Sequence, residues 1–199
     1  MLTKLRSCLQ IRAKHEKYVA KINLYMTQVM ENNSTSQIEI VRLPVSEWQS
    51  YKTLRLRALK VDPKAFGSSY EKESQAPDEK WQERLSNDNW ILFAKAEGQL
   101  VGMMGAFQTE TDKASQTANI YGVYVAQEAR GKGVSGMLME KLLGLLNEKS
   151  IVSVKLSVNK DQLAAVALYQ KFGFEVAGEE DMVLGDGINH TELLMTKSL

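Results

Sequence analysis

The 199 residues of the chain, 44% of them hydrophobic, can bury one sizeable core, and no feature indicates a second. The single cysteine, Cys8, excludes a framework of internal disulfides and suits the reducing cytoplasm. No apolar run is long enough to span a bilayer, and the first residues lack the apolar core of a secretory signal. We therefore predict a soluble, cytoplasmic protein without a membrane span.

Charge is distributed unevenly along the chain, although the formal net charge is only +1. Residues 1–30 contain six Lys or Arg and one Glu, so the remainder is net negative. A mildly acidic body suits a cationic substrate. It also argues against a nucleic-acid binder, which needs a basic face with aromatic side chains. His15 and His190 are too few and too far apart to predict a metal site.

Residues 1–36 are predicted to form a basic extension and a polar linker, followed by a domain over 37–199. A helix over 18–29 would be amphipathic, which leaves three functional interpretations open: partner docking, a membrane-surface helix or a targeting peptide. We favour a non-catalytic appendage or an upstream extension, because Met26 and Met30 are each plausible starts just before the domain.

Within the domain, hydrophobic periodicity and turn residues predict alternating strands and helices. Ser46 is expected to cap a helix that stops at Pro63, and the turn at 97–99 joins a hairpin. Gly173 is expected to end a later helix whose packing face includes Leu163. In chain order we expect a strand over 37–43, helices over 47–61 and 77–85, strands over 90–96, 100–108 and 119–125, a helix over 132–148, a strand over 154–158, a helix over 162–172, and closing strands over 174–181 and 190–196.

A glycine-rich turn lies between the strand expected over 119–125 and the helix that follows it. Gly131, Gly133 and Gly136 let the backbone come close to a ligand, and the first N–H groups of a helix lack partners within it. A strand, such a turn and a helix start form a phosphate-binding device. The run matches neither G-x-x-x-x-G-K-[ST] nor G-x-G-x-x-G, so both nucleotide-binding motifs are disfavoured.

The sequence Arg-Gly-Lys-Gly-Val-Ser at 130–135 resembles the Q/R-x-x-G-x-G/A signature of the GCN5-related N-acetyltransferases, the GNAT family. In that family the loop wraps the pyrophosphate of acetyl-CoA. Ser135 stands where Gly or Ala is usual, and we expect binding to survive because serine is small and keeps its N–H. The resemblance implies an α/β (α+β) fold, in which a central mixed, mostly antiparallel sheet is splayed between its fourth and fifth strands and flanked by helices.

A second run, about thirty residues later, resembles another motif of the same family, N-x-x-A-x-x-L-Y-x-x-x-G-F. Two motifs in the expected order are far more specific than either alone. Residues 54–71 also resemble the first helix of many bacterial members and the loop that helps wall the acceptor site. The matches to the second motif are Ala165, Leu168, Tyr169, Gly173 and Phe174, with Gln162 in place of the usual Asn.

The resemblance implies an N-acetyltransferase that moves the acetyl group of acetyl-CoA to a primary amine by direct attack in a ternary complex. Tyr169 would be the general acid, because a neutral phenol can protonate the departing thiolate. The backbone N–H of Val123 is the candidate donor to the oxyanion, and no metal is expected. The residues expected to bind acetyl-CoA are Val123, Tyr124, Val125, Arg130, Gly131, Lys132, Gly133, Val134, Ser135, Gly136, Gln162 and Tyr169.

The general base is not evident from the sequence. Ser157 stands where ribosomal-protein N-terminal acetyltransferases have a Glu, twelve residues before the catalytic Tyr. Glu71, Glu73 and Glu110 are candidates, although each is more simply interpreted as a solvated surface residue. A water chain near Asn119 and Ser157 is the other route.

The expected partners are acetyl-CoA and an amine acceptor, in the form of a small molecule, a peptide or a protein. No nucleic acid is expected as a partner, and no membrane span is expected. A homodimer is possible, and the sequence does not decide the oligomeric state. The alternative function is a non-catalytic acetyl-CoA sensor or scaffold, against which the presence of Tyr169 argues.

Overall fold

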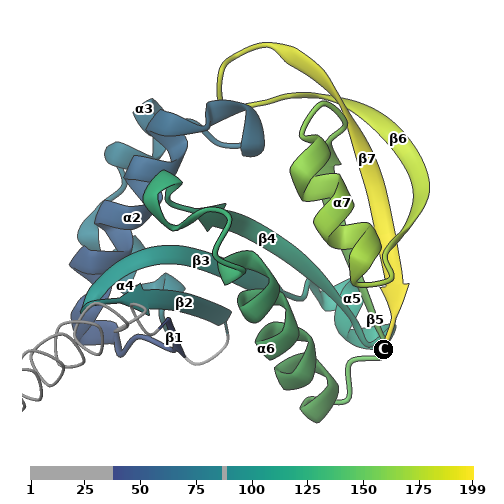
Figure 1. The fold of residues 1–199 in the computed structure, drawn as a ribbon, viewed down its shortest axis with the longest axis horizontal. Coiled ribbons are helices and arrows are strands. Elements are labelled where there is room, and N and C mark those ends of the chain that lie inside the picture. The colour runs from purple at the N-terminus through teal and green to yellow at the C-terminus, as the bar shows by residue number, and fades with distance from the viewer. Residues whose placement is uncertain (1–37, 87–88) are drawn as a thin grey trace, which may run out of the picture. The chain divides into compact units, whose positions relative to one another are not determined.

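The computed structural model describes residues 38–86 and 89–199. The extension and linker predicted over 1–36 lie outside the described residues, and so does Gln37, where the domain was expected to begin. Within the described part, one seven-stranded sheet has the order β1-β2-β3-β4-β5-β7-β6 (Figure 1). This order places the fourth and fifth strands side by side in the middle of the sheet.

The first four strands pair antiparallel, and they are β1 (Glu39–Val41), β2 (Trp90–Ala96), β3 (Gln99–Phe107) and β4 (Thr117–Val125). Glu97 and Gly98 have φ angles of 50° and 79°, the left-handed values that a tight turn between two strands requires. The predicted hairpin is therefore confirmed. Its second strand begins one residue earlier than expected, at Gln99.

The sheet opens between β4 and β5 (Ser153–Asn159). These two strands are parallel, and their register covers only the pairs from Thr117↔Ser153 to Asn119↔Lys155. Beyond Asn119, β4 pairs with no described strand on the β5 side. The outer strands β6 (Glu175–Val183) and β7 (Asn189–Ser198) complete the sheet antiparallel to β5 and to each other. The predicted mixed, mostly antiparallel sheet with an opening between its fourth and fifth strands is confirmed.

Two long helices cover opposite faces of the sheet, α2 (Trp48–Val61) and α6 (Val134–Glu148). The ring of Tyr51 in α2 lies 5.4 Å from that of Phe93. Ala94 follows Phe93 in β2 and pairs with Gly102 of β3. A Cβ at Gly102 would lie 3.3 Å from Leu138 of α6, on the other face of the sheet. Since neighbouring residues of a strand point to opposite faces, the core has a layer on each side of the sheet.

Short elements join these layers. The 3-10 turn η2 (Pro63–Ala65) follows α2, and α7 (Leu163–Lys171) lies beside the opening of the sheet (Figure 1). The remaining elements are η1 (Val45–Glu47), α3 (Tyr70–Ser74), α4 (Asp78–Arg84), α5 (Glu110–Ala114) and η3 (Gln127–Ala129). In the described part of the chain, no helix is long and apolar enough to cross a membrane.

Four expectations about helices need correction. Ser46 does not cap α2, because it lies within the 3-10 turn η1 and the start of α2 has no side-chain cap hydrogen bond. The helix expected from residue 132 begins at Val134, because Gly133 has a φ of 78° and cannot continue a right-handed helix. The packing face predicted for α7 was partly wrong, since Leu163 is 75% exposed while Tyr169 is buried. The helices α3 and α5 were not predicted, and each has only 5 residues, too few to show a helical period.

Candidate active site

A cleft of about 570 Å³ lies where the glycine-rich turn, β4 and α7 meet, and we call it the glycine-loop cleft. It gathers residues from segments that are far apart in the sequence. Lys132 and Gly136, which were predicted with the others, are not among its lining residues. The predicted residues that line it are Val123, Tyr124, Val125, Arg130, Gly131, Gly133, Val134, Ser135, Gln162 and Tyr169.

The glycines of the turn are needed for their backbone conformation. Gly131 and Gly133 have φ angles of 75° and 78°, which side chains with a Cβ rarely adopt. A Cβ at either position would meet no atom of the described chain within 4 Å. The space above the backbone is therefore open, and a ligand can approach the main chain directly.

The amino-terminal end of α6 has unpaired amides, and its first two residues, Val134 and Ser135, line this cleft. Met137 makes the first hydrogen bond of the helix, to the carbonyl oxygen of Gly133 at 3.1 Å. Among the described residues, the N–H groups of Val134, Ser135 and Gly136 have no hydrogen-bond acceptor. Free donors at the positive end of a helix favour an anion, and a pyrophosphate fits such an arrangement.

The turn is braced against α2 by two ion pairs. Arg57 binds Glu128 through two hydrogen bonds of 2.8 Å each, just before the turn. Arg130 bonds Asp62 at the end of α2 and also donates to the carbonyl oxygen of Val125 at 2.9 Å. The Arg130 side chain therefore holds the turn in place, a role that the sequence motif does not reveal.

Tyr169 lies at the inner end of the glycine-loop cleft. It is only 5% exposed, and its ring contacts that of Phe174 at 5.9 Å, edge to face. Within the described residues its hydroxyl makes no hydrogen bond. Burial, with a smaller contribution from the negative charge of Glu192, raises the pKa of Tyr169 well above its usual range. The phenol is therefore neutral at physiological pH.

A β-bulge re-aims the main chain of β4 at the opening. Between the pairs Met103↔Tyr124 and Gly105↔Tyr121, β4 has two residues, Gly122 and Val123, opposite the single Met104. Gly122 has a φ of 65°, so the bulge requires glycine there. Bulges occur often beside active sites, where they direct a main-chain group away from the ladder. Gly122 was not singled out from the sequence.

A second, larger cleft of about 1030 Å³ lies beside the first, on the side of the β6–β7 hairpin. We call it the hairpin cleft. It is lined by the 3-10 turn and loop after α2, by β4 from Asn119 to Gly122, and by β5 and β7. The two clefts share Ala65 and meet along β4, where Gly122 borders one and Val123 the other. Asn119 and Ser157, predicted as a route for water, both line the hairpin cleft.

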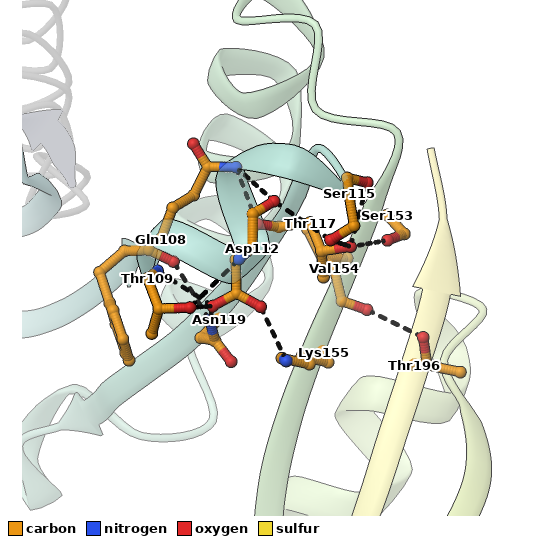
Figure 2. A network of polar contacts seen from close by, with 11 residues as sticks. Gln108, Thr109, Asp112, Ser115, Thr117, Asn119, Ser153, Val154, Lys155 and Thr196 are labelled. Carbon is orange, nitrogen blue, oxygen red and sulfur yellow. Dashed lines mark hydrogen bonds and ion pairs between the residues drawn. The ribbon is translucent and has the colours of Figure 1, made fainter.

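A polar network holds β4 and β5 together just before they separate (Figure 2). At its centre, the Asp112 carboxylate accepts hydrogen bonds from Thr109 and Asn119 and pairs with Lys155 at 2.9 Å. The hydroxyls of Thr117 and Ser153 lie 2.8 Å apart across the same two strands. Hydrogen bonds from Thr109 and Lys155 hold the pKa of Asp112 well below its usual range. The network therefore fixes where the opening begins.

The three candidate bases lie in different surroundings. Glu73 is not a solvated surface residue as expected, because it is 5% exposed and bound by Arg55 and Arg84. Burial alone would raise the pKa of Glu73, but these two arginines lower it to about 2, which makes it a poor base. Glu71 is exposed beside a neighbouring hollow, and Glu110 is exposed and pairs with Lys113.

Comparison with known proteins agrees with this geometry. Residues 54–174 match the model of the acetyltransferase (GNAT) family. The chain belongs to the GNAT family. The matched segment, which is more than half of the chain, runs from α2 through the glycine-rich turn to the end of α7.

Three similar proteins illustrate the relationship. The 5-NmdU N-acetyltransferase of Pseudomonas phage PaMx11 is 35% identical over 97 residues, which cover 49% of this chain and 65% of that protein. The L-amino acid N-acetyltransferase AaaT of Escherichia coli K12 is 30% identical over 104 residues, 51% of this chain and 64% of that protein. The match thus spans just under two thirds of each of these relatives.

The third comparison concerns the fold. The yncA structure from Salmonella typhimurium, solved with its cofactor acetyl-CoA, superposes with a TM-score of 0.69 at 16% identity. It covers 82% of this chain, and 95% of that chain is matched. This chain therefore has the GNAT fold, with its sheet opening beside the glycine-rich turn.

One buried carboxylate of the site was missed by sequence reasoning. Glu192, on β7, is a carboxylate that is only 7% exposed and lines the hairpin cleft. Tyr124 was predicted to bind acetyl-CoA, and its buried hydroxyl has no hydrogen-bond partner in the described chain. An isolated Glu in an alternating strand gives no signal of its burial. Its neighbours Thr191 and Leu193 belong to the run that was predicted as a closing strand.

Proposed function

We propose that the protein is an acetyl-CoA-dependent N-acetyltransferase that acetylates a primary amine by direct attack in a ternary complex. The observation that carries the proposal is the pair of clefts that meet at the β4 bulge. Membership of the acetyltransferase family and the names of the two relatives support it.

The glycine-loop cleft is proposed to hold the coenzyme. The free amides of Val134, Ser135 and Gly136 would bind its pyrophosphate, and the unpaired edge of β4 from Val123 to Val125 would bind its pantetheine arm. Gln162 lines the same cleft and offers an amide. When bound, acetyl-CoA supplies an activated acetyl thioester.

The protein's own groups are proposed to act at the boundary of the two clefts. The N–H of Val123, which lies in the bulge opposite Met104, would stabilise negative charge on the carbonyl oxygen, because the donor is fixed before that charge develops. Tyr169 would protonate the leaving sulfur, for which its neutral phenol is suited. The amine is proposed to enter through the hairpin cleft.

Coenzyme A release from acetyl-CoA tests the proposal. The purified chain would be assayed against L-amino acids, polyamines, short peptides and nucleosides bearing an amine, with mass spectrometry to confirm an added acetyl group. We expect turnover with at least one amine. No turnover with any acceptor, together with tight acetyl-CoA binding by calorimetry, would favour the alternative of a non-catalytic sensor or scaffold.

A further inference from the structure

Glu192 is a buried carboxylate that forms no direct ion pair with a described residue. It is 7% exposed, and it forms no hydrogen bond or ion pair with any described residue. Its side chain lines the hairpin cleft from β7. Register pairs Glu192 with Asn159 and Leu194 with Ser157, so these four side chains share one face of the sheet. A buried charge without a partner is costly and points to a functional role.

The other charged residues that line the hairpin cleft are already paired. Arg55 binds the carboxylate of Glu73, and Lys155 binds that of Asp112. Neither cation forms an ion pair with Glu192, although the buried Nη1 of Arg55 has no hydrogen-bond partner in the described chain. Among the lining residues Glu192 is the one carboxylate, so a cationic group entering the cleft would find its counter-ion there.

Glu192 also lies close to the proposed general acid. Its negative charge contributes to the raised pKa of Tyr169, which requires that the two groups be near each other. Tyr169 lines the glycine-loop cleft and Glu192 the hairpin cleft. The two residues therefore lie near each other while each lines a different cleft, as an acid and a base for one transfer would.

We propose that Glu192 is the general base, which binds the protonated amine of the acceptor in the hairpin cleft and removes its proton. The proposal rests on the proposed function. It implies a small acceptor with a primary ammonium group, because the carboxylate lies inside a cleft and not on the surface.

The charged surroundings of Glu192 support a basic carboxylate. Burial raises the pKa of Glu192, the carboxylate of Glu180 on β6 raises it further, and His190 two residues earlier on β7 lowers it. The neighbour on β5, Asn159, carries no charge, and Tyr169 on α7 is neutral at physiological pH. A higher pKa brings a carboxylate closer to the value that suits a base at neutral pH.

The proton balance is complete with these two residues. The ammonium proton passes to a carboxylate oxygen of Glu192, and the freed nitrogen lone pair forms the C–N bond as the C–S bond breaks. The departing sulfur takes the proton of the Tyr169 hydroxyl. The amide nitrogen then gives its second proton to the Tyr169 phenolate, which restores the phenol. Glu192 releases its proton to water, so that one proton is released in each turnover.

The kinetic test compares wild type with Glu192→Gln, using the acceptor that gives the highest turnover in the amine panel. Glu179→Gln, an exposed change on β6, is the matched control and should behave as wild type. We expect Glu192→Gln to lower kcat at pH 7 by at least about 100-fold, the usual contribution of a positioned base. Its residual rate should rise with pH in proportion to the free amine, whereas the wild-type rate should level off above the pKa of the base.

The second test needs no acceptor. A carboxylate with a raised folded pKa binds more protons when folded, so it destabilises the fold as pH rises above its unfolded pKa of about 4.3. Glu192→Gln lacks this charge. Its melting temperature should therefore exceed that of wild type at pH 8, and the difference should shrink towards pH 4.

The outcomes separate the inference from the function. A wild type that acetylates amines, with a Glu192→Gln variant of unchanged rate and pH profile, overturns the role of Glu192 alone. A folded variant that is less stable than wild type at pH 8 overturns the buried, unpaired carboxylate on which that role depends. A wild type that acetylates no amine overturns the function and the role together.

Discussion

Arg55 and Glu73 form a two-point ion pair, in which Arg55 Nη2 lies 2.7 Å from Glu73 Oε1 and Nε lies 3.2 Å from Oε2. Arg84 adds a third bond, with its Nη1 2.7 Å from Oε2. The three residues belong to α2, α3 and α4, so one carboxylate ties these helices together. Because Arg55 also lines the hairpin cleft, the same carboxylate supports the wall of the proposed acceptor site.

Replacing this carboxylate should destabilise the fold in a pH-dependent way. The folded pKa of Glu73, about 2, is depressed, so its contribution is complete above the unfolded pKa and is lost as pH falls through about 2. We expect Glu73→Gln to lower the free energy of unfolding at pH 7 by about 3 kcal/mol. Urea unfolding at pH 7 and pH 3 should show the difference from wild type narrowing at pH 3. The exposed neighbour change Glu71→Gln should leave both midpoints unchanged.

Removing the hydroxyl of Tyr169 should separate turnover from binding. Tyr169→Phe keeps the ring against Phe174 and loses only a hydroxyl that has no hydrogen-bond partner in the described chain. We expect kcat to fall about 100-fold or more, with the melting temperature and the calorimetric affinity for acetyl-CoA nearly unchanged. A variant with wild-type turnover would remove Tyr169 from the mechanism.

The sequence predicted those parts of the site that are formed by residues close together in the chain. The strand, the turn at Gly131 and Gly133 and the start of α6 are contiguous, and so are α7 and Tyr169, so their motifs could be recognised. The opening between β4 and β5 followed from the resemblance and was confirmed by their short register. These features depend on main-chain conformation more than on distant partners.

The charged parts of the site could not be predicted because their partners are remote in sequence. Glu73 meets Arg55 across 18 positions, and Lys155 meets Asp112 across 43. Whether a Glu is solvated, paired or left alone in a cleft is decided only when these segments pack. Glu73 was therefore expected to be solvated, and Glu192 was not singled out. Both are buried in the structure.

Close backbone packing at Gly185 should make that position intolerant of any side chain. Gly185 N–H donates to the Phe66 carbonyl at 2.7 Å, and a Cβ there would lie 2.4 Å from Ser68 O and 2.9 Å from Pro63 O. We expect Gly185→Ala to destabilise the fold by about 1–3 kcal/mol, because backbone atoms must move. Since Ser68 lines the hairpin cleft, KM for the amine should also rise, which steady-state kinetics would measure.

Gly144→Ala is the matched control for that change. Gly144 lies within α6, and a Cβ there meets nothing within 4 Å. Alanine is the better helix former, so this variant should be more stable by about 0.5–1 kcal/mol. If both alanine variants were equally stable by thermal melting, the turn at Gly185 would not pack against the backbone of the loop after α2 as the structure shows.

The last prediction concerns Gly133, whose φ of 78° makes it the left-handed cap before α6. Gly133→Val penalises that φ and places a branched side chain in the open space above the turn. If the free amides at the start of α6 bind the pyrophosphate, the variant should weaken acetyl-CoA at least tenfold, about 1.4 kcal/mol.

Lys132→Ala is the comparison that distinguishes a backbone site from a charge site. Lys132 is exposed and does not line the glycine-loop cleft, so its attraction for a phosphate acts through solvent and is screened by salt. We expect it to cost less than Gly133→Val in calorimetric titrations of both folded variants. If Gly133→Val bound acetyl-CoA like wild type while Lys132→Ala abolished binding, the turn would not be a backbone cradle, and the proposed coenzyme site would be wrong.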